Sequence, residues 1–192
     1  MTTVIVNKNK NKINVYSDRL YSAKNTLTNQ MEPENNFKDI KSIKVNDDLI
    51  LFSVGNMTLF MTLSDAWRRH PDYLAEIKDK DMLLAEIVEV SSKYSEICPE
   101  EQLYALFIVS KDEVLDLNIG LNINPVKPVS IIPTEYKITN IPQIYGDGRE
   151  MFKKPNKLNK LLKRDPKLVF DKISRNPKLG TSKEFDTLSI DI

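Results

Sequence analysis

Two β-hairpin patterns near the start of the chain constrain its fold more than any other feature of the sequence. Residues 3–8 (TVIVNK) and 12–16 (KINVY) are rich in β-branched side chains and flank a short polar turn, which predicts an antiparallel pair of strands. Residues 40–45 and 49–54 flank a turn of Asn and Asp residues (46–48) and predict a second hairpin. The strand LILFSV in that hairpin is almost continuously apolar, so we expect it to be covered on both faces.

Two helical patterns follow the second hairpin. Residues 56–69 place apolar side chains at helical spacing along one stripe, which consists of Leu59, Phe60, Leu63 and Trp67. A longer pattern spans residues 79–97 and ends before Pro99, because proline interrupts a helix. Its expected buried side consists of Leu83, Leu84, Ile87, Val88, Tyr94 and Ile97.

Strand patterns then return, and this order decides the fold class. Residues 103–109, 113–119 and, less clearly, 128–138 predict strands, and the terminal FDTLSIDI predicts one more. A helix is expected over residues 165–175, which open with the Asp-Pro pair typical of a helix start. Hairpins before and after a pair of helices favour an α+β fold over a parallel sheet with crossover helices. The length of 192 residues suits one domain, residues 1–192.

The composition is ordinary for a soluble globular protein and excludes several classes of function. Lys and Arg number 28 against 27 Asp and Glu, so the net charge of +1 attracts neither nucleic acid nor an anionic membrane. No apolar run is long enough to span a bilayer, and the N-terminus lacks a signal-peptide pattern. The single cysteine, Cys98, excludes an internal disulfide, and the single histidine, His70, is expected at a solvated helix end. We therefore expect a cytoplasmic protein that uses no metal or cofactor.

One segment departs from this even balance of charge. Residues 149–164 contain seven Lys and Arg residues and only one acid, Glu150. Such a segment is usually a solvated helix or loop, but it could also dock an acidic partner or contact phosphate groups. Because Phe152 is the only aromatic residue among these cations, the segment gives little support to binding of single-stranded nucleic acid.

The first residues give the N-terminus a chemistry of its own. Removal of Met1 would leave Thr2 with a free α-amine beside its own hydroxyl, so that one residue could supply both a nucleophile and a base. Asp18 follows sixteen residues later, at the end of the first hairpin. Taken alone, Thr2 is more often an ordinary second residue and Asp18 an ordinary turn carboxylate.

Together with later motifs, these residues resemble the proteasome β-subunits and HslV-like peptidases of the N-terminal-nucleophile (Ntn) hydrolases. Chains of this family begin with TT and apolar residues and carry an aspartate at a strand end, as do residues 2–5 and Asp18. A second family motif, K-I-x-K-I-N-D before an apolar strand and a glycine, resembles KSIKVND (residues 41–47), LILFSV and Gly55. A glycine-rich motif before a later helix is matched weakly by residues 146–148 (GDG). The resemblance implies a four-layer αββα sandwich, with two antiparallel sheets between layers of helices.

The resemblance also implies a role for each matched residue. Thr2 would supply the attacking hydroxyl, and Lys41 a positive charge that lowers the proton affinity of that hydroxyl. Asp18 would pair with Lys41 and offset the cost of burying its ammonium group. The backbone N–H of Gly55 would bind the developing oxyanion. The walls of the substrate pocket would be formed by Ser53 and Met57.

Two supporting positions depart from the family pattern. Asp147 stands where the family has a serine in the glycine-rich motif, and a carboxylate there would favour the protonated amine and weaken it as a base. Near the C-terminus the family usually has an aspartate followed by Ser-Gly-Gly, whereas this chain has Lys178 in place of the acid and Thr181 in place of the serine.

Three hypotheses follow. The first is a threonine-type endopeptidase that cleaves peptides or unfolded proteins within a homo-oligomeric ring. Since the chain lacks the phosphate-binding loop G-x-x-x-x-G-K-[ST], unfolding of substrates would then need a separate ATPase. The second is a catalytically inactive proteasome-like subunit that acts in assembly or protein binding. The third is an unrelated α+β binding protein in which the N-terminal match is a coincidence.

Overall fold

The structure is a computed structural model that describes residues 2–19, 22–24, 31–33, 41–97, 102–121, 129–176, 179 and 181–192. The side chains of residues 22–24, 31–33, 97, 102 and 147 lie outside this description, as do Met1, Cys98, Pro99 and Lys178. The chain forms two compact units. The first consists of Met1–Ser42, Thr139–Ile190 and Ile192, and the second of Ile43–Ile138 with Asp191. The single domain expected over residues 1–192 stays a prediction.

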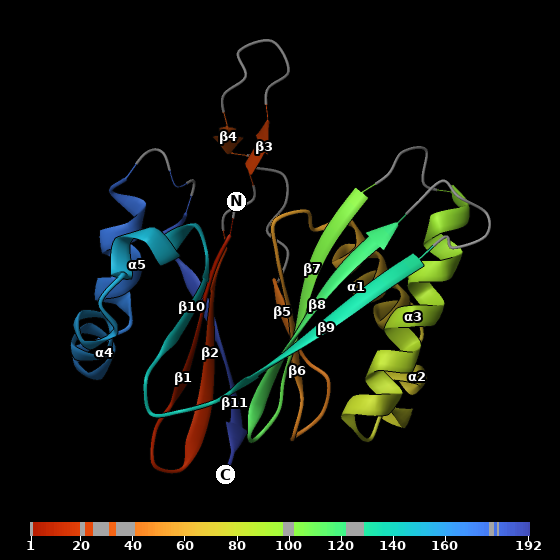
Figure 1. The fold of residues 1–192 in the computed structure, drawn as a ribbon, viewed down its shortest axis with the longest axis horizontal. Helices are drawn as coiled ribbons and strands as arrows, with labels where there is room; N and C mark the ends of the chain where they lie inside the picture. Colours follow the sequence, from red (N-terminus) through yellow and green to blue (C-terminus); the bar gives the residue numbers. More distant parts are fainter. Residues whose placement is uncertain are drawn as a thin grey trace. The chain divides into compact units, whose positions relative to one another are not determined.

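The first unit contains a four-stranded sheet in the order β10-β1-β2-β11 (Figure 1). Its strands are β1 (Thr3–Lys8), β2 (Lys12–Asp18), β10 (Gln143–Gly146) and β11 (Phe185–Asp191). Since β1 pairs antiparallel with β2, the predicted first hairpin is confirmed, and the second strand runs on beyond residue 16 to Asp18. β1 also pairs antiparallel with β10, which joins distant parts of the sequence. Two further short strands, β3 (Ser22–Lys24) and β4 (Met31–Pro33), pair with each other.

Three helical segments pack on one face of this sheet. They are the 3₁₀ helix η1 (Asp147–Phe152) and the α-helices α4 (Pro155–Arg164) and α5 (Lys167–Ser174). The core of this unit joins strand residues to helix residues, namely Ile5, Tyr16, Phe152, Leu158, Leu162, Val169, Phe170 and Ile173. Asp165 precedes α5 as expected, and its Oδ1 accepts a hydrogen bond from the N–H of Lys167 at 2.9 Å. The basic segment therefore forms η1 and α4, with Leu158 and Leu162 buried and its lysines exposed.

The second unit contains a five-stranded sheet in the order β5-β6-β7-β8-β9. Its strands are β5 (Ser42–Lys44), β6 (Ile50–Val54), β7 (Gln102–Val109), β8 (Glu113–Leu121) and β9 (Val129–Lys137). β5 and β6 are neighbours, and the N–H of Val45 donates to the carbonyl of Leu49 at 2.9 Å, so the predicted second hairpin is present. Residues 50–53 of β6 are fully buried, as expected for a strand covered on both faces. The predicted strands after the helices are also confirmed.

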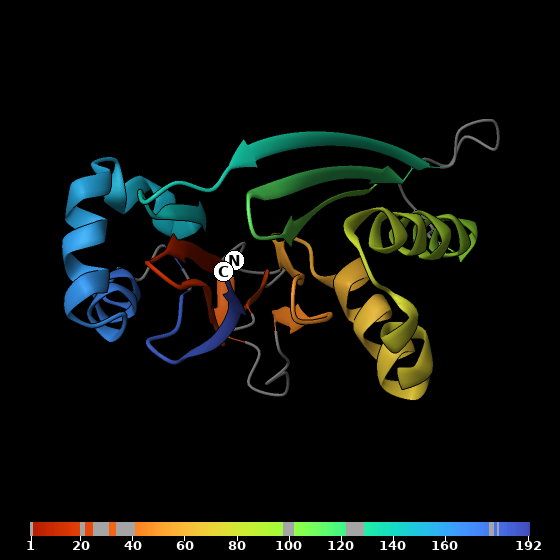
Figure 2. The same cartoon turned by 90° about the horizontal axis from the view of Figure 1, so that it is seen from below.

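The helices of the second unit are α1 (Thr58–Arg69), α2 (Pro71–Glu76) and α3 (Lys80–Ile97), which lie beside its sheet (Figure 2). The four stripe residues of α1 are all buried, as predicted. The sequence predicts a helix end at His70 and Pro71 and no helix directly after it, so α2 is a difference from the prediction. In the structure the chain bends at His70, and Pro71 occupies the first turn of α2.

The prediction for the buried side of α3 is wrong for Val88, and for Ile97 it concerns a side chain outside the described residues. Val88 is 41% exposed, whereas Leu83, Ile87 and Ser91 are fully buried. These three residues are spaced four apart and share one face of the helix, and Val88 lies about 100° around the axis from Ile87. Ser91 therefore takes a core position that its polarity did not suggest.

The predicted α+β class with two antiparallel sheets and accompanying helices is confirmed. Each sheet has helices in its own unit, and both termini of the chain run into the sheet of the first unit through β1 and β11. Within the described residues, every helix is too short or too polar to cross a membrane.

Candidate active site

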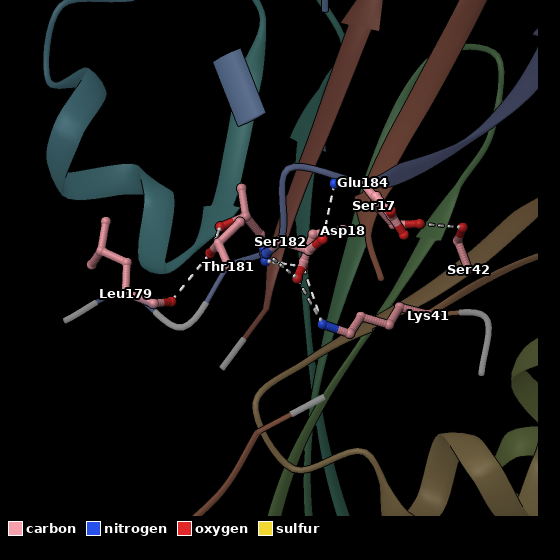
Figure 3. A network of polar contacts seen from close by, with 9 residues as sticks. Ser17, Asp18, Lys41, Ser42, Leu179, Thr181, Ser182 and Glu184 are labelled. Atoms are coloured by element: carbon pink, nitrogen blue, oxygen red, sulfur yellow. Dashed lines mark hydrogen bonds and ion pairs between the residues drawn. The ribbon is translucent and has the colours of Figure 1, made fainter. Parts of the chain in front are cut away.

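The centre of the candidate site is a buried ion pair between Lys41 and Asp18 (Figure 3). Lys41 Nζ lies 3.1 Å from each carboxylate oxygen of Asp18. Both side chains are almost completely shielded from solvent, with exposed fractions of 1% and 0%. The structure therefore brings together the two charged residues for which the sequence predicted a partnership, Asp18 at the end of β2 and Lys41 just before β5.

Two backbone N–H groups also bind the Asp18 carboxylate. The N–H of Thr3 donates to Oδ1 at 2.8 Å, and the N–H of Ser182 donates to Oδ2 at 3.4 Å. Burial raises the pKa of Asp18, while the ammonium of Lys41 and these two N–H groups act in the opposite direction. Lys41 is the strongest of these opposing influences, so the ionised carboxylate depends on it most.

Thr2 directly precedes Thr3, whose backbone nitrogen binds the carboxylate of the ion pair. Its Cα is about 2.4 Å from the Thr3 nitrogen, and that nitrogen is bonded to Asp18 at 2.8 Å. Thr2 itself is only 2% exposed. Because Val4 lies opposite Ser17 in the β1–β2 ladder, the hairpin register sets the start of β1 beside Asp18.

A second polar contact runs parallel to the ion pair. Ser17 Oγ and Ser42 Oγ lie 2.9 Å apart, and both residues are buried. Ser17 precedes Asp18 and Ser42 follows Lys41, so two neighbouring contacts join the end of β2 to the start of β5 (Figure 3). The clamp, as we call these four residues, therefore fixes Lys41 through its backbone neighbour as well as through its ammonium group.

Thr181 reaches the site but is directed toward Thr3. The hydroxyl of Thr181 donates to the carbonyl of Leu179 at 3.1 Å and lies 2.9 Å from the Thr3 hydroxyl. A hydroxyl carries a single hydrogen, so Thr3 must be the donor in its contact with Thr181. Thr181 thus orients the second residue of the TT pair, and through it the backbone that binds Asp18.

Each glycine of the GDG motif is suited to its position for a different structural reason. Gly146 has φ 78°, a conformation that suits glycine best. Gly148 is closely surrounded: a Cβ there would lie 2.9 Å from carbons of Ile144, Ile173 and Thr3. The motif therefore allows η1 to approach the start of β1. The side chain of Asp147 lies outside the described residues, so its supporting role stays a prediction.

Gly55, Ser53 and Met57 belong to the second unit, whereas the residues around Asp18 belong to the first. Gly55 ends β6 with φ 85°, and a Cβ added to it would meet no atom within 4 Å. Ser53 is fully buried, and its hydroxyl donates to the carbonyl of Ala105 at 3.1 Å. Met57 is 9% exposed at the start of α1. Their roles in oxyanion and substrate binding stay predictions.

The centre of the site is a buried charged pair. Among the described residues, no three His, Cys, Asp or Glu side chains gather closely enough to hold a metal ion. The carboxylate of Asp18 is already bound by one ammonium and two N–H groups. Its chemical part is therefore to fix the charge of Lys41 next to the N-terminal strand.

Comparison with known proteins identifies the fold of this chain. No family model matches the chain, and no curated protein matches its sequence. One similar solved structure is eukaryotic HslV from Trypanosoma brucei, with 12% identity, 99% of both chains covered and a TM-score of 0.48. Another is a Gly-1 mutant of Anbu from Hyphomicrobium sp. strain MC1, with 13% identity, 100% of this chain and 82% of that chain covered, and a TM-score of 0.52. The chain has a proteasome-like fold. At this identity the likeness concerns the Ntn-hydrolase fold alone.

Sequence reasoning missed several residues of this candidate site. Thr3 and Ser182 bind Asp18 through backbone N–H groups, which every residue type except proline carries, so their side chains gave no signal. Ser17 and Ser42 did leave a weak signal, because each is a small hydroxyl residue next to one member of the expected ion pair.

Proposed function

We propose that the protein is a threonine-type peptidase of the Ntn-hydrolase kind, with Thr2 as its nucleophile after removal of Met1. The observation that supports this most is the buried Lys41–Asp18 pair, whose carboxylate also binds the N–H of Thr3 next to Thr2. Burying an ion pair is costly, and a hydrophobic pair of similar volume is often at least as stable. A buried ammonium whose carboxylate partner binds the backbone next to Thr2 therefore suggests chemistry rather than stability.

In the proposed reaction, the hydroxyl oxygen of Thr2 attacks the carbonyl carbon of the scissile peptide bond. The proton of the hydroxyl passes to the free α-amine of Thr2, directly or through a water molecule, while the positive charge of Lys41 favours the alkoxide form. The tetrahedral intermediate then loses the leaving amine, which takes the proton back from the protonated α-amine of Thr2. Water hydrolyses the resulting ester of Thr2 and restores the free hydroxyl.

Several parts of this function remain proposals from the sequence. Gly55 would donate an N–H to the oxyanion, and Ser53 and Met57 would line the substrate pocket. The substrate would be a peptide or unfolded protein, and the active form a homo-oligomeric ring in the cytoplasm. Because the chain has no phosphate-binding loop, a separate ATPase would unfold protein substrates.

A second candidate, a proteasome-like subunit without catalysis, is favoured by the orientation of Thr181. Its single hydroxyl hydrogen is donated to the carbonyl of Leu179, so Thr181 cannot donate a hydrogen bond to the amine of Thr2 as a supporting serine could. In this case the chain would act in assembly or in binding another protein, and Met1 could be retained.

The test combines intact mass with peptide hydrolysis. We expect the purified protein to begin at Thr2, to hydrolyse some members of a fluorogenic peptide panel, and to react at Thr2 with an electrophilic peptide probe. Thr2→Ala should reduce hydrolysis to background, whereas Thr2→Ser, which keeps a hydroxyl, should retain part of it. Hydrolysis that is unchanged in Thr2→Ala would refute the proposal. A retained Met1 without hydrolysis would support the second candidate.

A further inference from the structure

The exposed side of α4 carries a concentrated positive charge. Residues 149–175 contain ten Lys and Arg residues against three acids, although the whole chain has a net charge of only +1. The basic face, as we call it, consists of the exposed residues Lys153, Lys154, Lys157, Lys160, Lys163, Arg164 and Lys167. The apolar residues of α4 point the other way, into the core of the first unit.

Two cations of this region act on each other. Contact with the side chain of Lys157 on α4, and then its positive charge, lower the pKa of Lys172 on α5. Lys172 Nζ also lies 6.0 Å from the centre of the Phe152 ring, at the distance of a weak cation–π contact. Like charges held this closely on a surface are more stable when an anion binds between or beside them.

The opposite charge gathers on another helical surface of the same chain. Residues 71–97, which form α2 and α3, contain seven acids and three bases. Met82, Glu86, Glu89 and Lys93 follow each other at helical spacing along one side of α3. Glu89 pairs with Lys93 at 2.5 Å, whereas Glu86 has no ion-pair partner in the part of the chain that the structure describes.

A pocket in this acidic surface adds a place for a side chain to enter. It has a volume of about 540 Å³ and lies among the three helices of the second unit. Its lining includes Tyr73, Tyr94, Glu86, Glu89 and Lys93. Because Lys93 pairs with Glu89, the pocket offers a second cationic side chain mainly the carboxylate of Glu86 and the two aromatic rings. We call this surface of α2 and α3, with Tyr73, Met82, Glu86 and Glu89, the acidic face. Tyr73 is 57% exposed and Met82 is 41% exposed, so both side chains can make apolar contacts with a partner.

We propose that the basic face of one copy docks on the acidic face of a second copy, with a lysine of α4 entering the pocket beside Glu86 and Glu89. Charge complementarity favours a second copy over another acidic protein, because one chain carries both faces and is nearly neutral overall. The inference rests on the homo-oligomer of the proposed function and names the surfaces that join its subunits.

The two faces differ, so the contact is head-to-tail and can repeat from copy to copy. Such a contact closes into a ring when its rotation allows closure and otherwise continues into a filament. The contact depends on charge, so salt must weaken it. The long apolar stems of the lysines can cover Tyr73 and Met82 while their ammonium groups meet the acids.

The experiment is a charge swap read by sedimentation velocity and light scattering at low and high salt. Lys157→Glu with Lys160→Glu reverses the basic face, and Glu86→Lys with Glu89→Lys reverses the acidic face. We expect wild type to assemble, and each reversed variant alone to associate at least about tenfold more weakly. A mixture of the two variants should assemble again, since every contact in it joins opposite charges. Lys8→Glu with Lys10→Glu, at the β1–β2 turn, is the matched control and should assemble as wild type does.

Each other outcome overturns the inference in a distinguishable way. A monomeric wild type would remove both the contact and the proposed homo-oligomer. Assembly that survives both reversals would leave the oligomer but refute these two faces. Loss of assembly without rescue in the mixture would show that the basic face binds a different acidic surface. Circular dichroism of each variant verifies folding, and Lys157→Glu should not impair it, because it replaces the repulsion from Lys172 with attraction.

Discussion

Replacement of Lys41 by methionine probes the buried ion pair more directly than any other substitution. Methionine has a similar length but no charge, so Lys41→Met removes the ammonium partner of the Asp18 carboxylate and keeps its hydrogen bonds from the N–H groups of Thr3 and Ser182. The complementary variant, Asp18→Asn, keeps the shape of the side chain and removes the carboxylate that pairs with the buried ammonium of Lys41. The double variant removes both charges together.

The expected magnitudes follow from the burial of both groups. Breaking a buried pair by removing one partner costs about 3–5 kcal/mol of unfolding free energy, because an uncompensated charge remains inside. The double variant leaves no such charge, so we expect it to lose only about 1–3 kcal/mol. The coupling energy, which is the sum of the two single costs minus the cost of the double variant, is therefore roughly 3–9 kcal/mol and lies well above the deviation from additivity of distant sites.

The pH dependence of the unfolding free energy is an independent test, because its direction can be worked out in advance. Burial raises the pKa of Asp18 above its ordinary value of 3.8, so the folded protein holds this proton at pH values where the unfolded chain has lost it. Stability from this group therefore falls as the pH rises through the window from 3.8 to the raised pKa. Lys41→Met removes the strongest influence that lowers this pKa and widens the window upward. We expect its destabilisation to be smaller at about pH 5 than at about pH 8.

Urea unfolding followed by circular dichroism measures all four proteins of this cycle at both pH values. Asp18→Asn is the control for the pH effect, since it has no carboxyl group to titrate at this position. Additive single costs, or a loss in Lys41→Met that does not depend on pH, would contradict the view that these two charges stabilise each other. A change in the slope of unfolding against urea would instead indicate an altered folded or denatured state.

Two further substitutions test packing. Gly148→Ala should lower the unfolding free energy by about 1–3 kcal/mol, because its Cβ would lie 2.9 Å from Thr3, Ile144 and Ile173 carbons, and an unchanged urea midpoint would refute this close approach. Ser91→Ala should raise stability by about 1 kcal/mol, since the buried Ser91 hydroxyl has no hydrogen-bond partner among the described residues. Thermal unfolding of Ser91→Ala beside Ser92→Ala, which loses a bond to the Val88 carbonyl, measures the difference, and a lower melting temperature for Ser91→Ala would contradict it.

Local patterns were sufficient for most of the elements. The hairpin of β1 and β2 follows from β-branched residues around a polar turn, and α1 follows from an apolar stripe of period 3.6, because both signals lie within a few residues of each other. Where a local signal was ambiguous, prediction failed: Pro71 suggested the end of a helix but begins α2. Val88 is exposed and Ser91 is buried, because the rotation of α3 about its axis relative to its neighbours decides which face is buried.

The resemblance to Ntn hydrolases predicted the partnership of Asp18 and Lys41, but local sequence could not, because the two residues are 23 positions apart. The contribution of residues 181 and 182 was even harder to predict from the sequence, since they follow Asp18 by more than 160 positions and act largely through backbone atoms. Such contacts depend on where the chain returns in space rather than on its composition.

By itself, the sequence determined the kind of elements, their order and the presence of a threonine directly after Met1, because propensity and periodicity act over short distances. The tertiary structure alone decided that Asp18 and Lys41 are shielded from water, that Thr3 and Ser182 bind the same carboxylate, and that Thr181 turns toward Thr3. Burial and charge pairing depend on segments that meet only after folding, and they decide how strongly two opposite charges act on each other.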